Sequence, residues 1–390
     1  MLKNICIPTA LLLTLDDIAW HNGRDLRDIS QASRSGLPRD HHPEDYKIIA
    51  ELGKALGMRI LCPLCLGDWD KENILRGEVG VTHDPYNWDR ASKINLEYAN
   101  KCFEALESAD YIEYAIHGIL HGAYDENGKL IWEREHFVKK FDENGKAYPH
   151  FDPDNFKRRL DLFFKLYDMW GFSQKIRTYV SPCGMNGVTP EALDLMAEEL
   201  YSRDIRYATN AYYDFPESFK VHGGITFTQK CGNNGGRFIP WNAFDVDPDY
   251  VIDFTEEKLP ASSVIGMHWT NFLRYNPENN MERLDAWVRY MNRQAEVFGI
   301  ILSKDIAFSN NQQFYEKYTK ITEGDGKIVL DFSDVLANRT KAQTSEVYIS
   351  FRNGNEPKTA IGGTLELYDT RKGHKTYKIT HEGDRVELVF

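Results

Sequence analysis

Strand-like apolar runs alternate with amphipathic helical patterns from residue 1 to about residue 320, and this alternation restricts the fold more than any other feature. Such alternation is typical of a parallel sheet with helices packed outside it. About seven runs fit a barrel better than an open sheet, so we predict a distorted (β/α)7 barrel, an α/β fold, for residues 1–319. Strands are expected at 7–15, 58–66, 111–117, 175–180, 205–209, 263–268 and 300–308, and helices at 44–56, 92–108, 155–169, 190–200 and 281–298.

The pattern changes after residue 320. Residues 320–390 alternate apolar and polar side chains between glycine-containing turns, which predicts a small antiparallel β module, similar to a β-sandwich. No aromatic cluster marks a carbohydrate-binding face there, so packing against the barrel is the favoured role. Within the barrel region, residues 122–152 contain two Asp-Glu-Asn-Gly turns and are expected to form a β-hairpin.

Charge and composition exclude some classes of protein. The net charge of −12 argues against nucleic-acid binding, which depends on basic side chains, and no apolar run is long enough to span a membrane. The apolar start lacks a cleavage site and is interpreted as a strand, so the chain is expected to be cytoplasmic or a processed secreted or periplasmic form. Cys62 and Cys65 are interpreted as ordinary buried thiols. The oligomeric state stays open.

Four polar motifs follow successive predicted strands. They are Asp16-Asp17, His117-Gly-Ile-Leu-His121, Tyr179-Val-Ser-Pro-Cys-Gly184 and a final His268. Gly118 disfavours a helix, so the two histidines are not a helical zinc motif. Each motif alone is equally well explained as a polar turn. Together they lie at the carboxyl ends of strands, the face that holds the chemistry in β/α barrels.

This ordered set resembles the polysaccharide deacetylases of the NodB type, carbohydrate esterase family 4. The resemblance covers residues 1 to about 310. It implies a catalytic base at Asp16, metal ligands at Asp17, His117 and His121, and a general acid at His268. It also implies that Trp241, with Asp245 or Asp247, tunes that acid. The implied cofactor is a divalent metal, Zn²⁺ in the first place, with Co²⁺, Mn²⁺ or Ni²⁺ as alternatives.

The sequence departs from the family pattern at three positions. Ile18 stands where the family usually has glycine, and Gly118 replaces a serine or threonine. Val180 stands where an arginine normally pairs with the base, and Arg177 or Arg39 are the candidates to replace it.

Aromatic residues near these motifs are candidates for stacking against a sugar. They are Trp20, Trp69, Tyr124, Trp241 and Trp269. Packing at the rim of the barrel is the alternative, and the sequence does not decide between the two. His41 and His42 are interpreted as residues of a surface loop.

These observations predict a metal-dependent hydrolase that removes an acyl group, such as acetyl, from a carbohydrate. One carboxylate and two imidazoles suit a divalent metal with open positions, where water becomes a nucleophile near neutral pH. One alternative is a metal-free glycoside hydrolase, which needs two carboxylates: Asp16 or Asp17 with Glu113, Asp245 or Asp247. The other is a noncatalytic glycan-binding protein on the same scaffold.

Overall fold

The structure is a computed structural model of the chain. It describes residues 4–19, 39–185, 188–210, 219–232, 263–269, 272–324, 326–352, 356–371 and 373–390. The predicted site residues Trp20, Trp241, Asp245 and Asp247 lie outside these ranges, and His268 is described by its backbone. Among the helices within these ranges, none has the length and apolar character that a membrane span needs.

Seven parallel strands pair in a closed circuit and give the chain a barrel-like α/β fold. Each strand pairs with the next one in the circuit, and the pairings of β2 with both β14 and β4 close it. In order around the circuit they are β2 (Ala10–Asp16), β4 (Ile60–Cys65), β5 (Ile112–Gly118), β10 (Thr178–Val180), β11 (Tyr207–Asn210), β13 (Ile225–Gly232) and β14 (Val264–His268). Their carboxyl ends lie at one end of the barrel, which places the sequence motifs at that end.

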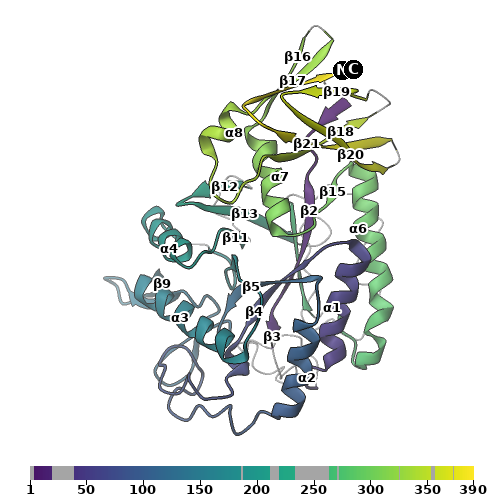
Figure 1. Cartoon of the computed structure of the whole chain (residues 1–390). Coiled ribbons are helices and arrows are strands. Elements are labelled where there is room, and N and C mark those ends of the chain that lie inside the picture. Colours follow the sequence, from purple (N-terminus) through teal and green to yellow (C-terminus); the bar gives the residue numbers. More distant parts are fainter. Residues whose placement is uncertain are drawn as a thin grey trace.

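Helices cover the outside of the strands (Figure 1). They are α1 (Pro43–Leu56), α2 (Leu96–Glu107), α3 (Pro153–Trp170), α4 (Pro190–Ser202), α6 (Leu284–Phe298) and α7 (Ile306–Tyr318). A proline in the first turn fixes the starts of α1, α3 and α4, as Pro43 and Pro190 predicted. The side chain of Thr189 accepts a hydrogen bond at the start of α4, and Gly57 ends α1 with a φ of 63°.

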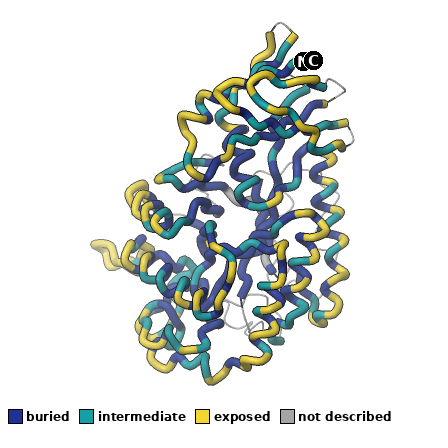
Figure 2. The backbone as a smooth tube through the Cα atoms, viewed as in Figure 1, coloured by how far each residue is buried: buried dark blue, intermediate teal, exposed yellow. Residues whose placement is uncertain are grey.

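The central strands form the core of the molecule (Figure 2). Every residue of β2 and β4 is buried. Strands that are covered on both faces read as continuous apolar runs instead of alternating ones, and both of these strands do so. Close-packed neighbours surround β2, which ends at Asp16, and β4, which carries Cys62 and Cys65, so both strands have little freedom to move.

The C-terminal module consists of two four-stranded antiparallel sheets. One contains β1 (Ile5–Cys6), β18 (Glu346–Arg352), β21 (His374–His381) and β20 (Gly363–Arg371), and the other contains β16 (Lys320–Gly324), β17 (Lys327–Asp331), β22 (Arg385–Val389) and β19 (Thr359–Ile361). One hydrophobic cluster includes side chains of both sheets, as in a sandwich. The predicted boundary falls between α7 and β16. The module also contains the short helix α8 (Ser333–Asn338), which follows β17.

The N-terminus corrects the predicted domain division. Strand β1 pairs with β18 instead of joining the barrel, and the predicted strand 7–15 begins only at Ala10. Ile7 packs in the hydrophobic cluster of the C-terminal module. The first residues of the chain are therefore part of the module that the sequence assigned to residues 320–390.

Other elements also differ from the prediction. The run 300–308 is divided between β15 (Ile301–Leu302), which pairs with β2 beside the circuit, and the start of α7, where Asp305 accepts a hydrogen bond from the amide of Phe308. The seventh strand of the circuit is instead β13, which follows β12 (Phe219–His222) in a hairpin. The insertion 122–152 holds two antiparallel pairs: β6 (Ala123–Tyr124) with β7 (Leu130–Trp132), and β8 (Phe137–Phe141) with β9 (Ala147–Phe151).

Candidate metal centre

Asp17, His117 and His121 converge at the carboxyl end of the barrel. Oδ1 of Asp17 lies 3.1 Å from Nε2 of His117 and 3.5 Å from Nε2 of His121. The two imidazole rings are 5.0 Å apart between their centroids, and all three side chains are buried. Donor atoms of a tetrahedral Zn²⁺ site with bonds of about 2.0–2.1 Å lie about 3.3 Å apart, so these separations have the size of a coordination shell.

The backbone at Asp17 explains how its carboxylate leaves the regular strand. Strand β2 ends at Asp16, and Asp17 has a φ of 63°, in the left-handed region. Pairing then resumes in β3 (Ile18–Ala19), which lies beside β4. A left-handed aspartate costs roughly 1 kcal/mol, and such strain is concentrated at functional sites in proteins.

His117 is placed by an irregularity in the sheet. Leu64 pairs with Ile116 and Cys65 pairs with Gly118, so His117 is the extra residue of a bulge between β4 and β5. Its Nδ1 lies 2.7 Å from the carbonyl oxygen of Val180. A carbonyl can only accept, so Nδ1 carries the proton, and the Nε2 of a neutral ring directs a lone pair at the carboxylate of Asp17. A cation or a proton must therefore lie between these two atoms.

Glu135, from the insertion, holds the loop that joins the two histidines. Its carboxylate accepts hydrogen bonds from the amides of Ile119, Leu120 and Gly122, and it pairs with the buried Arg159 at 3.4 Å. A Cβ added to Gly118 would come within 2.5 Å of the same carboxylate. Glycine is thus required at position 118 by this contact and by its φ of 119°.

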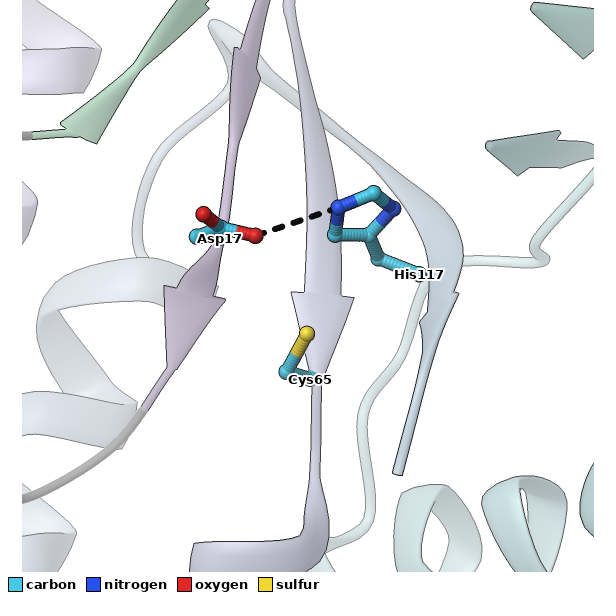
Figure 3. A group of neighbouring side chains, drawn as sticks. All are labelled: Asp17, Cys65 and His117. Atoms are coloured by element: carbon cyan, nitrogen blue, oxygen red, sulfur yellow. Dashed lines mark ion pairs between the residues drawn. The ribbon is translucent and has the colours of Figure 1, made fainter. Parts of the chain in front are cut away.

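Sequence reasoning missed Cys65, Glu133 and Cys183, which form two groups of possible ligands with members of the predicted triad. The thiol of Cys65 and the ligand atoms of Asp17 and His117 all lie within 4.8 Å of one another (Figure 3). His121 forms a second such group with Glu133 and Cys183, and the Cys183 thiol donates to Glu133 at 2.6 Å. The Cys-x-x-Cys spacing was the available signal for Cys65, because its second cysteine ends a barrel strand. Cys65 is fully buried in the hydrophobic core, as predicted, and its thiol also lies beside the ligand atoms of Asp17 and His117.

The proposed base and acid lie side by side in the sheet. Asp16 is buried, pairs in register with residue 268 across β2 and β14, and accepts a hydrogen bond from the Thr14 hydroxyl at 3.3 Å. Neither predicted arginine replaces the missing partner at position 180. Arg39 forms a two-pronged ion pair with Asp45, and Arg177 precedes β10 at the opposite end of the barrel.

The described aromatic candidates are core residues instead of an exposed sugar platform. Trp69 packs edge-on against Trp170, and Trp269 packs against Tyr46 and His41. Trp69, Trp269 and Tyr124 are at most 3% exposed, so no ring face is open to a sugar in this conformation. His41 is also fully buried, and the prediction of a surface loop is wrong for this residue. His42 is partly exposed beside Glu44.

Glu113 lies too far from the centre to act with Asp17 as a glycosidase pair. It is four residues before His117 on β5, roughly 13 Å along an extended strand, whereas the two carboxylates of glycosidases lie about 5–10 Å apart. Burial, followed by the nearby charge of Asp305, raises its pKa to about 7. Its carboxylate accepts a hydrogen bond from the amide of Ile306 at the start of α7, which indicates a structural carboxyl group.

Comparisons with known proteins do not identify a family for this chain. No protein-family model matches it, and no curated protein does. Among solved structures, a candidate alpha-N-acetylgalactosaminidase from Bacillus halodurans C-125 is 11% identical, covers 98% of this chain and 97% of its own, and has a TM-score of 0.31. An endogalactoceramidase is 9% identical, covers 98% and 96%, and has a TM-score of 0.29. Similarity at this level supports no argument about fold or function.

Proposed function

We propose that the chain is a metal-dependent hydrolase that removes an acyl group from a carbohydrate, on a barrel of the NodB type. The observation that carries the proposal is the geometry at His117. Its Nδ1 donates to the Val180 carbonyl, which leaves Nε2 as the ring nitrogen that faces the Asp17 carboxylate, at 3.1 Å. Metal-binding histidines characteristically donate their second ring nitrogen to a carbonyl or carboxylate in this way.

Asp17, His117 and His121 would hold the metal. A divalent metal such as Zn²⁺ supplies Lewis acidity: it lowers the pKa of water to about 7 and polarises a carbonyl. The ligand set of one carboxylate and two imidazoles is typical of such sites. An imidazolium paired with Asp17 is the competing explanation of the same distances, and it places a proton where the metal would lie.

Two further residues perform the proton transfers under this proposal. Asp16, at the end of β2, accepts the proton of the attacking water, and His268, its neighbour in register, donates a proton to the leaving amine or alkoxide. In place of an arginine at position 180, the structure offers Asp16 a hydrogen bond from the Thr14 hydroxyl. A base and an acid in these positions fit the hydrolysis of the amide or ester bonds of acetylated sugars.

Metal content and acetate release test the proposal together. Asp17→Ala and His121→Ala are expected to lose the metal and the release of acetate from a panel of N- and O-acetylated glycans. Asp16→Asn is expected to keep the metal and lose the activity, because the base is not a ligand. The exposed pair His222 and Asp194, 2.6 Å apart, provides matched controls, since His222→Ala and Asp194→Ala remove the same side chains far from the centre.

Each failure has a distinct meaning. Full metal content in Asp17→Ala would overturn the ligand assignment. A metal-loaded protein that releases no acetate from any glycan, and whose properties Asp16→Asn leaves unchanged, would favour the noncatalytic glycan-binding protein. Glycosidic cleavage in a metal-free preparation would favour the glycoside hydrolase.

A further inference from the structure

The thiol of Cys65 lies beside the ligand atoms of Asp17 and His117, although the candidate site can be defined without it. Cys65 is the last residue of β4, and β4 lies between β2 and β5 in the sheet. Asp17 follows β2, and His117 lies near the end of β5. The side chain that ends the middle strand therefore faces the space between the other two. Figure 3 shows the sulfur directed toward the Asp17–His117 pair.

The bulge at His117 produces this arrangement. It shifts the pairing so that Cys65 is level with Gly118 instead of His117, which leaves the imidazole beside the thiol. Ligand atoms of Cys65, Asp17 and His117 all lie within 4.8 Å of one another, and the three side chains are buried. In a tetrahedral site with a Zn–S bond of about 2.3 Å, sulfur lies about 3.6 Å from a nitrogen ligand.

We propose that the thiolate of Cys65 is a ligand of the metal that Asp17 and His117 bind. This inference rests on the proposed function, because it concerns the same metal. The thiol loses its proton to solvent when the metal binds, since the thiolate is the coordinating form. Zn²⁺ sites expand to five ligands in some enzymes, so a thiolate beside the three predicted ligands leaves a position for water.

The thiolate determines which metal the site selects. Sulfur is a soft donor that favours Zn²⁺, whereas carboxylates and water favour Mn²⁺ and Mg²⁺. Removal of the sulfur is therefore expected to weaken the binding of Zn²⁺ by at least about tenfold, the lower end of the loss seen for residues that only support a ligand. Binding of Mn²⁺ is expected to change far less. Metal selectivity is thus assigned to the residue that ends β4.

Spectroscopy of the full-length wild-type protein tests the inference before any residue is changed. The Zn²⁺-loaded protein is examined by X-ray absorption for a sulfur neighbour at about 2.3 Å. The Co²⁺-loaded protein is examined for the intense near-ultraviolet band of a thiolate–cobalt bond. Cys65→Ser is expected to abolish both signals. Cys62→Ser and Cys183→Ser are expected to keep them.

Cys62 is the matched control because it lies three residues earlier on the same strand and is equally buried. Burial, with the charges of Glu113 and Asp16, raises the pKa of its thiol, so it stays protonated. A wild-type protein that binds metal through nitrogen and oxygen alone overturns the inference and leaves the proposed function standing. Signals that survive in Cys65→Ser and disappear in Cys183→Ser overturn it as well. A wild-type protein that binds neither metal overturns both proposals.

Discussion

Replacement of Glu135 by glutamine is the most informative single change to this protein. The Glu135 carboxylate accepts amide hydrogen bonds from Ile119, Leu120 and Gly122 and pairs with Arg159, and both charged side chains are about 5% exposed or less. Glutamine keeps the shape but removes the charge, and its amide group meets N–H donors where an acceptor is needed. The variant therefore changes the electrostatics of this loop with little change in packing.

The magnitude follows from the burial of the partners. Removal of one member of a buried ion pair costs about 3–5 kcal/mol, because the remaining charge is left without compensation. A hydrogen bond to a charged group contributes about 1.5–3 kcal/mol, although such contributions do not add independently. We therefore expect Glu135→Gln to lower the free energy of unfolding by about 3–5 kcal/mol. Because the loop joins His117 to His121, metal affinity is expected to fall by about 10–100-fold.

Urea unfolding followed by circular dichroism measures the stability, and competition with a chelator measures the metal affinity. Glu97→Gln, in the exposed ion pair with Lys101, is the control and is expected to leave both unchanged. The double variant Glu135→Gln/Arg159→Met removes the uncompensated charge and is expected to recover stability but not metal affinity. Unchanged metal affinity in a folded Glu135→Gln protein would refute the positioning role of this carboxylate.

Three other changes test separate parts of the structure. The pKa of Glu113 is about 7 in the folded protein and 4.5 in its ordinary state, which stands for the unfolded chain. The native state therefore keeps the proton to higher pH, and the free energy of unfolding falls as pH rises from about 4.5 to 7. Glu113→Gln should remove that fall and raise the free energy of unfolding by on the order of 3 kcal/mol at pH 8, measured by urea titration. Gly118→Ala should destabilise the protein by about 1–3 kcal/mol or more in the same assay, because its Cβ meets the Glu135 carboxylate at a φ of 119°; an unchanged midpoint would contradict this contact. Trp69→Ala should lower stability by about 3–5 kcal/mol while metal stoichiometry in the folded fraction persists, as expected for a core residue; loss of glycan binding alone would instead restore the sugar-stacking role.

The sequence predicted the convergence of Asp17 with His117 and His121 for a simple reason. All three lie at or just after the ends of apolar runs that were predicted as parallel strands, and parallel strands in a barrel end on one face. Helix starts at Pro43 and Pro190 were predictable because proline restricts where a helix can begin.

Other parts of the site depend on contacts that no local pattern encodes. The bulge at His117 changes the pairing of β5 with β4 by one residue, and that shift sets where the imidazole lies relative to Cys65. Glu135 lies in an insertion, and nothing in its surroundings indicates that it binds the loop amides. Trp69 and Trp269 follow motif strands, where rim and core positions carry the same residue types. Packing alone distinguishes the two, and packing is a property of the whole fold.

The pairing of β1 with β18 has a consequence for how the chain folds during synthesis. Ile5 is made 346 residues before its partner Phe351, and the Phe351 ring lies 5.9 Å from that of Phe390. Strand β1 cannot form its hydrogen bonds to the sheet until β18 has been made. Long-range pairing of this kind is slow, so β18 and β1 are expected to join last, and nascent chains are exposed to premature association through that open strand edge.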